Sequence, residues 1–298
     1  MPSWILEYLL LSAVWGTSFL FMQISVHELG VMPTAALRVA IAAFTLLPWL
    51  HWRGQWGALR AHWRPIALAG LINPVIPFVL YAYALQSLTT GLASILNATT
   101  PLFGAVIALL WLRERLTASR VLGLFIGFVG VVALAWDRLG LGGSPGSGWA
   151  VLVCLGAPLM YGLGASFTQR HLKQVPSLAI ATGSLLASSV ALALPALWFW
   201  PAATPALHGW LAVICVGVMC TGFAYVLFFR LIERVGSART LTVTFLIPVF
   251  AIVAGAVWLD ESITLRMLVC GAVILTGTTL STGLVRSRWL DGLGGRKP

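Results

Sequence analysis

The sequence predicts an all-α integral membrane protein with ten transmembrane helices, arranged as two inverted five-helix repeats with both termini in the cytoplasm. Three observations predict this fold class: an apolar composition, ten apolar runs of membrane-spanning length, and a motif that occurs once in each half of the chain. Of the 298 residues, 59% are hydrophobic and only 9% are charged. A surface of this composition requires lipid around it, which excludes an ordinary water-soluble protein.

Ten apolar runs, separated by charged or turn-forming residues, provide the predicted helices. A helix crosses the hydrocarbon core with about 20 mostly apolar residues. The runs are continuously apolar and lack the alternation of a barrel strand, so they are assigned as helices. In chain order they are residues 4–24, 34–50, 65–85, 91–112, 121–136, 148–169, 178–198, 209–231, 240–259 and 265–284. The first is too long for a signal-peptide core and is expected to remain in the protein.

The basic residues fix the predicted orientation. With a cytoplasmic N-terminus, 15 of the 18 Lys and Arg lie on the cytoplasmic side, and Arg38, Arg138 and Arg266 remain for the other side. This bias follows the positive-inside rule, and one helix more or fewer would scramble it. The net charge of +10 is therefore assigned to contact with lipid headgroups, and nucleic acid is not expected as a partner. Arg38 is expected to extend toward the headgroups, with a place at a cavity mouth as the alternative.

A motif repeats 147 residues along the chain. Residues 111–117 read Trp-Leu-Arg-Glu-Arg-Leu-Thr, and residues 258–264 read Trp-Leu-Asp-Glu-Ser-Ile-Thr. Three further pairs share this spacing: Pro48 with Pro195, Pro101 with Pro248, and Gly130 with Gly277. Five helices per half is an odd number, so the second half enters the membrane from the opposite side, and such repeats place a transport site near the midplane. The motif residues Glu114 and Glu261 are expected to bond helix ends or a nearby Arg, with substrate contact as the alternative.

The repeat divides the chain into four parts. We expect a first five-helix repeat over residues 1–139, a Gly/Ser/Pro linker over 140–148, a second repeat over 149–285 and a basic cytoplasmic tail over 286–298. A Gly stripe in the fifth helix, partly repeated in the tenth, predicts that these two helices are scaffold. All four cysteines lie inside apolar runs without ligand spacing, so no disulfide, metal or cofactor is expected.

The two motif copies, each followed by a Gly-rich apolar helix, and residues 15–19 (Trp-Gly-Thr-Ser-Phe) resemble the drug/metabolite transporter superfamily, in particular its ten-helix EamA-type exporters. The resemblance spans nearly the whole chain. It implies a multi-pass secondary transporter of the bacterial inner membrane that exports amino acids and related metabolites, aromatic amino acids among them. The four-helix multidrug relatives carry a glutamate before a Gly-Thr pair in helix one, where this chain has Ala13 before Gly16. A proton/drug antiporter of that kind is therefore disfavoured.

Neutral side chains are predicted to line the binding site. No Asp, Glu, Lys or His lies centrally in a predicted helix, so we expect alternating access without stoichiometric proton coupling. Helical spacing places polar and aromatic residues on shared helix faces. The predicted substrate-binding residues are Trp15, Phe19, Asn73, Tyr81, Ser94, Asn97, Tyr161, Thr221, Tyr225 and Thr244. The alternative assigns the aromatic residues to interfacial belts and the polar ones to interhelical hydrogen bonds.

Prolines are predicted to loosen the helix backbone near this site. A proline cannot donate to the carbonyl four residues back, so Pro101 frees that of Asn97 and Pro248 that of Thr244. Such carbonyls would accept from an ammonium group, whereas Asn97 and Trp15 would donate to a carboxylate. The predicted helix-breaking or gating residues are Pro74, Pro77, Pro101, Pro158 and Pro248.

Two other functions compete with amino-acid export. One is a broad exporter of lipophilic drugs or metabolites, and the other is a membrane-embedded lipid-modifying enzyme. An enzyme needs a nucleophile with a base, a metal cluster or a carboxylate array. The chain has no Ser/His/Asp, HExxH or DxxD pattern, so no catalytic residues are expected. The expected partners are a small-molecule substrate and membrane lipids, with the monomer as the functional unit.

Overall fold

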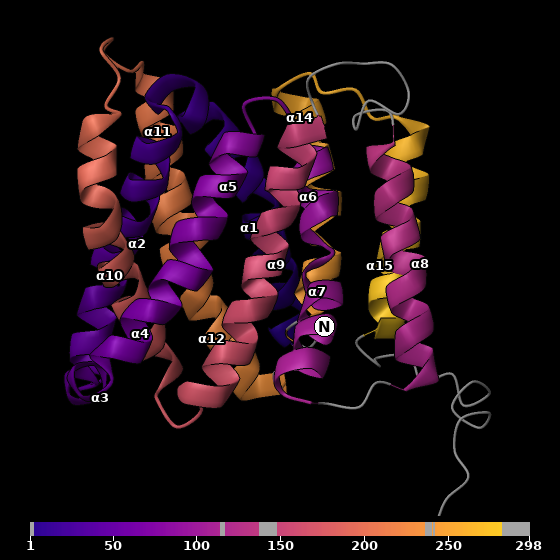
Figure 1. The fold of residues 1–298 in the computed structure, drawn as a ribbon. Helices are drawn as coiled ribbons and strands as arrows, with labels where there is room; N and C mark the ends of the chain where they lie inside the picture. Colours follow the sequence, from indigo (N-terminus) through magenta and orange to yellow (C-terminus); the bar gives the residue numbers. More distant parts are fainter. Residues whose placement is uncertain (1–2, 114–116, 137–147, 236–239, 241, 282–298) are drawn as a thin grey trace, which may run out of the picture.

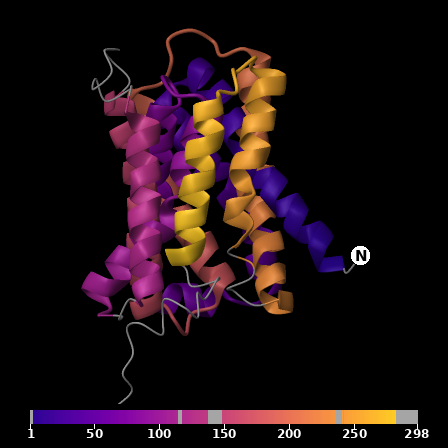
Figure 2. The same ribbon diagram turned by 90° about the vertical axis from the view of Figure 1, so that its right-hand side faces the viewer.

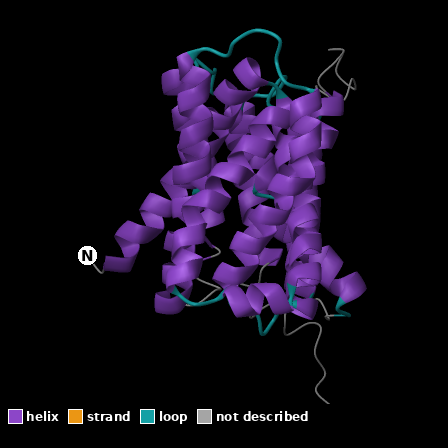
Figure 3. Ribbon diagram, turned by 90° about the vertical axis from the view of Figure 1, so that its left-hand side faces the viewer, coloured by secondary structure: helices purple, strands orange, loops and turns teal. Residues whose placement is uncertain are grey.

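The computed structural model describes residues 3–113, 117–136, 148–235, 240 and 242–281, and these residues form helices joined by turns and loops, without strands (Figure 3). Eight helical runs within this part are long and apolar enough to span a membrane. Two shorter apolar helices, Val243–Trp258 and Leu265–Ser281, lie where the ninth and tenth helices are predicted. The predicted linker over 140–147, the basic tail over 286–298 and Glu114 of the motif lie outside the described residues.

The helices of the first half begin at the N-terminus and end before residue 137. They are α1 (Ser3–Leu29), α2 (Val31–Trp52), α3 (Trp56–Ala61), α4 (Trp63–Gly70), the π-helical turn η1 (Leu71–Val75), α5 (Ile76–Ala84), α6 (Thr90–Asn97), α7 (Thr100–Trp111) and α8 (Ala118–Ala135). Gly30 alone separates α1 from α2, and its φ of 83° is a conformation that glycine adopts without steric cost. The chain therefore reverses within one residue at this point.

The second half repeats most of this order. Its helices are α9 (Gly148–His171), α10 (Ser177–Trp198), α11 (Leu207–Gly217), the π-helical turn η2 (Val218–Phe223), α12 (Ala224–Val235), the 3-10 turn η3 (Thr242–Phe245), α14 (Ile247–Trp258) and α15 (Leu265–Ser281). The turns η1 and η2 begin 147 residues apart, as do α7 and α14. The sequence repeat is therefore also a repeat of local structure.

The two motif copies have similar backbone geometry at their third and last residues, which the structure describes in both copies. Arg113 and Asp260, its third residues, have φ values of 56° and 52°, which are uncommon for residues other than glycine. The motif threonines Thr117 and Thr264 each accept a hydrogen bond from the backbone N–H three residues later, at 3.4 and 3.2 Å. Each motif is thus a helix end followed by the N-cap of the next helix.

Corresponding segments of the two halves run in opposite directions. In Figure 1 the chain rises from α4 to α5, whereas it descends from α11 to α12 on the same side of the bundle. Figures 2 and 3 also show that the N-terminal end of α1 leans outward from the bundle.

Helices α8 and α15 pack closely against each other at one edge of the molecule (Figures 1 and 2). A Cβ atom added at Gly277 would overlap the backbone of Gly127, and one added at Gly123 would overlap the backbone at Ser281. This close approach requires glycine, which is the close helix contact that the stripe of small residues predicts.

Candidate functional site

The fourth predicted helix is broken in the middle of the bundle. Helix α6 ends at Asn97 and α7 begins at Thr100, with Pro101 in its first turn. The Asn97 carbonyl, which Pro101 cannot bond, instead accepts the hydroxyl of Thr100 at 2.8 Å. The carbonyl that was predicted to be free is therefore satisfied locally.

Four predicted site residues come together at this break. The Tyr81 hydroxyl donates a hydrogen bond of 2.7 Å to Asn97 Oδ1. The ring of Phe19 meets Tyr81 edge-on, with centroids 5.5 Å apart, and the Tyr161 ring lies 6.2 Å from Tyr81. These side chains come from α1, α5, α6 and α9, so both halves of the chain contribute to one interior contact.

Arg38 is the charged residue of this region, and its predicted position was wrong. Its side chain does not reach the headgroups: it is 7% exposed, and its guanidinium carbon lies 3.8 Å from the centre of the Phe78 ring. Its Nε donates to Thr221 Oγ1 at 3.0 Å, and Nη1 contacts Met22 Sδ at 3.3 Å. The prediction of an interior without charge is thus corrected.

The predicted start of the second helix accounts for the error at Arg38. The second helix was predicted from residue 34, but α2 begins at Val31. Arg38 therefore lies seven residues inside the helix, about 10 Å along its axis. That depth is too great for a side chain aimed inward to reach the headgroups.

Aromatic residues of α12 add further ring contacts near the site. The Trp15 ring lies 5.3 Å from Phe228, which contacts Phe229, and Phe229 stacks on Tyr225 at 6.1 Å. Thr221, in the π-helical turn η2, donates its hydroxyl to the Val216 carbonyl at 2.8 Å while it accepts from Arg38. The printed contacts form three sets, centred on Tyr81, on Arg38 and on Phe228, and helical spacing brings the sets together, because each pair Trp15 and Phe19, Phe78 and Tyr81, and Thr221 and Tyr225 shares a helix face. We define the interior cluster as the following residues of these sets: Trp15, Phe19, Arg38, Phe78, Tyr81, Asn97, Tyr161, Thr221 and Tyr225.

Three further predicted site residues are not part of the interior cluster as defined above. Ser94 is fully buried and donates its hydroxyl to the Gly91 carbonyl of its own helix at 2.7 Å. The Asn73 amide packs against the backbone of Gly164 in α9. Thr244, half-buried in η3, corresponds by spacing to Asn97 and likewise lies just before a helix that begins with a proline.

The predicted helix-breaking prolines behave in three ways. Pro101 and Pro248 lie in the first turns of α7 and α14. Pro74 lies within η1 and Pro77 in the first turn of α5, so this pair accompanies a wide helical turn. Pro158 lies inside the continuous 24-residue helix α9, and the prediction that it breaks a helix is wrong. One missing hydrogen bond does not end a helix when the neighbouring turns stay bonded.

Several polar atoms of the interior cluster remain available. Within the described part of the chain, the Asn97 amide nitrogen, the phenols of Tyr161 and Tyr225 and the Trp15 indole have no hydrogen-bond partner. None of them is among the polar atoms that are sealed from solvent without a partner. Each of these atoms therefore keeps some accessible surface and can form a further hydrogen bond.

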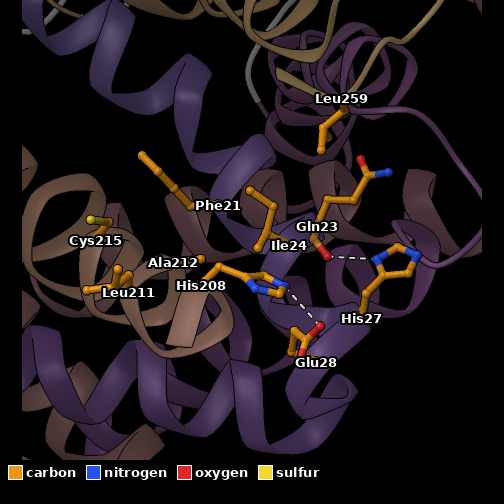
Figure 4. Close-up of a pocket in the computed structure, with 10 residues that line it drawn as sticks. All are labelled: Phe21, Gln23, Ile24, His27, Glu28, His208, Leu211, Ala212, Cys215 and Leu259. Carbon is orange, nitrogen blue, oxygen red and sulfur yellow. Dashed lines mark hydrogen bonds and ion pairs between the residues drawn. The ribbon is translucent and has the colours of Figure 1, made fainter. Parts of the chain in front are cut away.

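The surface hollow between α1 and α11 is a weaker candidate for the functional site. It has a volume of about 580 Å³, and within it Glu28 accepts from His208 at 2.9 Å (Figure 4). Glu28 also accepts the Ala206 backbone N–H at 2.9 Å, so its carboxylate is already occupied. None of the residues that line this hollow belongs to the interior cluster. We therefore take the interior cluster as the candidate functional site.

A duplicated, multi-pass helical bundle with polar and aromatic groups gathered at broken helices defines a membrane transporter. The EamA-like transporter family model matches residues 2–136 and again residues 148–283. The chain therefore belongs to the EamA family of the drug/metabolite transporter superfamily.

Curated relatives cover nearly the full chain. An uncharacterized transporter of Archaeoglobus fulgidus is 24% identical over 283 residues, covering 93% of this chain and 97% of that protein. YvbV, an uncharacterized transporter of Bacillus subtilis, is 26% identical and covers 90% of this chain and 87% of its own. A protein of Streptantibioticus cattleyicolor named "Probable terminal-alkyne amino-acid exporter" is 25% identical, covering 89% of each chain. A solved crystal structure shares the fold, with a TM-score of 0.68, 22% identity and coverage of 99% of this chain and 100% of that one.

Proposed function

We propose that this protein exports amino acids or related small amphipathic metabolites, aromatic amino acids among them, across the bacterial inner membrane by alternating access. The observation that carries the proposal is the Tyr81–Asn97 hydrogen bond at the break between α6 and α7, enclosed by aromatic rings. A few polar groups among apolar and aromatic surfaces suit an amphipathic solute. The name of the Streptantibioticus relative supports the same substrate class.

The proposed topology has ten crossings with both termini in the cytoplasm and the monomer as the transporting unit. The opposite chain directions of α4–α5 and α11–α12 support inverted repeats (Figure 1). The distribution of Lys and Arg supports the orientation. The family supports a carrier rather than an enzyme.

Transport is proposed to follow the solute gradient or the membrane potential without stoichiometric proton coupling. Within the described residues, Glu7 is bound by Arg230 and Arg234, Glu28 pairs with His208, and Glu261 bonds a helix end. None of these carboxylates belongs to the interior cluster, where a proton relay would need one.

Proteoliposomes that contain the purified full-length chain test this function. We expect saturable uptake of one or more labelled amino acids, with an initial rate that does not respond to an imposed pH gradient at constant potential. In cells, expression should raise resistance to toxic amino-acid analogues rather than to cationic dyes. Dye resistance without amino-acid movement would favour the drug exporter and overturn the proposal.

A further inference from the structure

Arg38 has unused hydrogen-bonding capacity. A guanidinium carries five N–H donors in a fixed fork. In the described structure, Nε donates to Thr221 and one Nη1 donor faces the weak acceptor Met22 Sδ, which leaves three donors, both of those on Nη2 included. Nη2 is not among the polar atoms that are sealed off without a partner. Nη2 therefore keeps some accessible surface, although Arg38 as a whole is only 7% exposed.

The Arg38 charge also has no carboxylate partner in the described part of the chain. The ion pairs there involve only Glu7 and Glu28, each with partners elsewhere. A charge held away from water without an opposite charge is costly. The face of the Phe78 ring, 3.8 Å from the guanidinium carbon, compensates only part of this cost. An anion bound at the open edge of the fork would supply the missing partner.

A carboxylate fits this position better than a point anion. The planar fork of an arginine matches the two oxygens of a carboxylate through parallel hydrogen bonds. The Phe78 ring lies 3.8 Å from the guanidinium carbon, and Tyr81 lies on the same face of α5, so an apolar body attached to the carboxylate would lie beside aromatic side chains. None of the described carboxylates lies in the interior cluster to pair with an ammonium group.

We propose that Arg38 binds the carboxylate of the transported solute, so that the protein selects monocarboxylates with an apolar or aromatic body, and that an amino group on the solute is dispensable. This inference rests on the proposed function, because it places the solute in the same interior cluster. Amino acids are then one subset of the substrates. Amines that lack a carboxylate are rejected, since Arg38 repels them.

Three ligands of matched size test the proposal on the wild-type protein: phenylalanine, 3-phenylpropionate, which lacks the amino group, and phenethylamine, which lacks the carboxylate. Each competes with labelled phenylalanine for uptake into proteoliposomes, and its binding to detergent-purified protein is followed by thermal stabilisation. We expect 3-phenylpropionate to compete and to stabilise as phenylalanine does, whereas phenethylamine does neither. Equal competition by phenethylamine and 3-phenylpropionate would overturn the proposal, and this comparison needs no variant.

Variants assign the effect to Arg38. Arg38→Met should weaken 3-phenylpropionate binding by about tenfold or more, the loss expected for a hydrogen-bonded charged partner. Arg38→Lys should retain part of the affinity because it keeps the charge without the fork. Arg60→Met removes a charge from the exposed helix α3 and should bind normally. Should Arg38→Met fail to fold, the comparison of the three ligands on the wild-type protein still tests whether the carboxylate is required.

Two outcomes separate this inference from the proposed function. Normal phenylalanine transport by Arg38→Met, with an unchanged KM, would overturn the carboxylate assignment and leave amino-acid export intact. Binding of 3-phenylpropionate that depends on Arg38, in a wild-type protein that moves no amino acid, would support the assignment and remove the proposed function alone.

Discussion

The carboxylate of Glu261 accepts both the backbone N–H and the side-chain hydroxyl of Thr90, each at 2.7 Å. Thr90 is the first residue of α6, and the Gly91 N–H reaches the same carboxylate at 3.4 Å. A motif residue of the second repeat therefore caps a half-helix of the first, where unpaired N–H groups favour a negative charge.

Removal of this cap should destabilise the protein. We expect Glu261→Ala to cost about 1–2 kcal/mol, because it leaves helix N–H groups unpaired. Glu261→Gln should cost less, since its amide oxygen still accepts. Thermal unfolding of the purified protein is followed by the loss of monodisperse material. The unfolding temperature should fall from the wild type to Glu261→Gln and further to Glu261→Ala. An Ala variant as stable as the wild type would show that water replaces the cap.

The α8–α15 contact gives a prediction with two glycines of the same helix. A Cβ at Gly277 would overlap the Gly127 backbone, whereas one at Gly271 would meet Ile95 at an ordinary 3.5 Å. Gly277→Ala should therefore lower the unfolding temperature clearly. Gly271→Ala should be neutral or stabilising, since alanine favours a helix by about 1 kcal/mol over glycine. Equal behaviour of the two variants would contradict the packing described for α8 and α15.

The sequence predicted the repeat and the helix break because both depend on local chemistry. Pro101 and Pro248 cannot donate a hydrogen bond, and each stands at the start of a helix. Pro158 has the same chemistry but lies inside the continuous helix α9, which packs against α5, α6 and α7. Whether a proline begins a helix or lies inside one depends on the tertiary surroundings, which the local sequence does not show.

The site was only partly predictable for a similar reason. Helical spacing identified Tyr81 and Asn97 as facing the interior, but spacing alone could not separate them from Ser94, which bonds its own helix. Arg38 was missed because an error of three residues at the start of α2 decided between lipid headgroups and the bundle interior. Contacts such as that of Arg38 with Thr221 join residues 183 positions apart, beyond the reach of periodicity.

The Tyr81 hydroxyl is predicted to position Asn97 for the solute. Tyr81→Phe removes the donor to Asn97 Oδ1 and keeps the ring contact with Phe19. We expect a several-fold higher KM for the transported amino acid, consistent with the loss of about 1 kcal/mol from one hydrogen bond. Tyr83→Phe, on an exposed residue of the same helix, is the control and should transport normally. Matching KM values for the two variants would remove Tyr81 from the site.

The break at Pro101 is predicted to matter for turnover. Pro101→Ala restores an N–H that can bond the Asn97 carbonyl and compete with Thr100 for it. We expect a lower maximal rate with a smaller change in KM, because a more continuous helix resists the movement between conformations. Pro48→Ala, inside α2 and exposed, should leave the rate unchanged. Rates are compared in proteoliposomes at equal protein content, and a Pro101→Ala rate equal to the wild type would exclude this role.

Counterflow of labelled phenylalanine into proteoliposomes, with wild-type protein and Asn97→Ala side by side, tests the central claim most directly. The interior cluster as the transport site predicts saturable counterflow by the wild type and a strong reduction in Asn97→Ala, with both proteins inserted equally. Undiminished counterflow in Asn97→Ala would place the transport site elsewhere in the molecule.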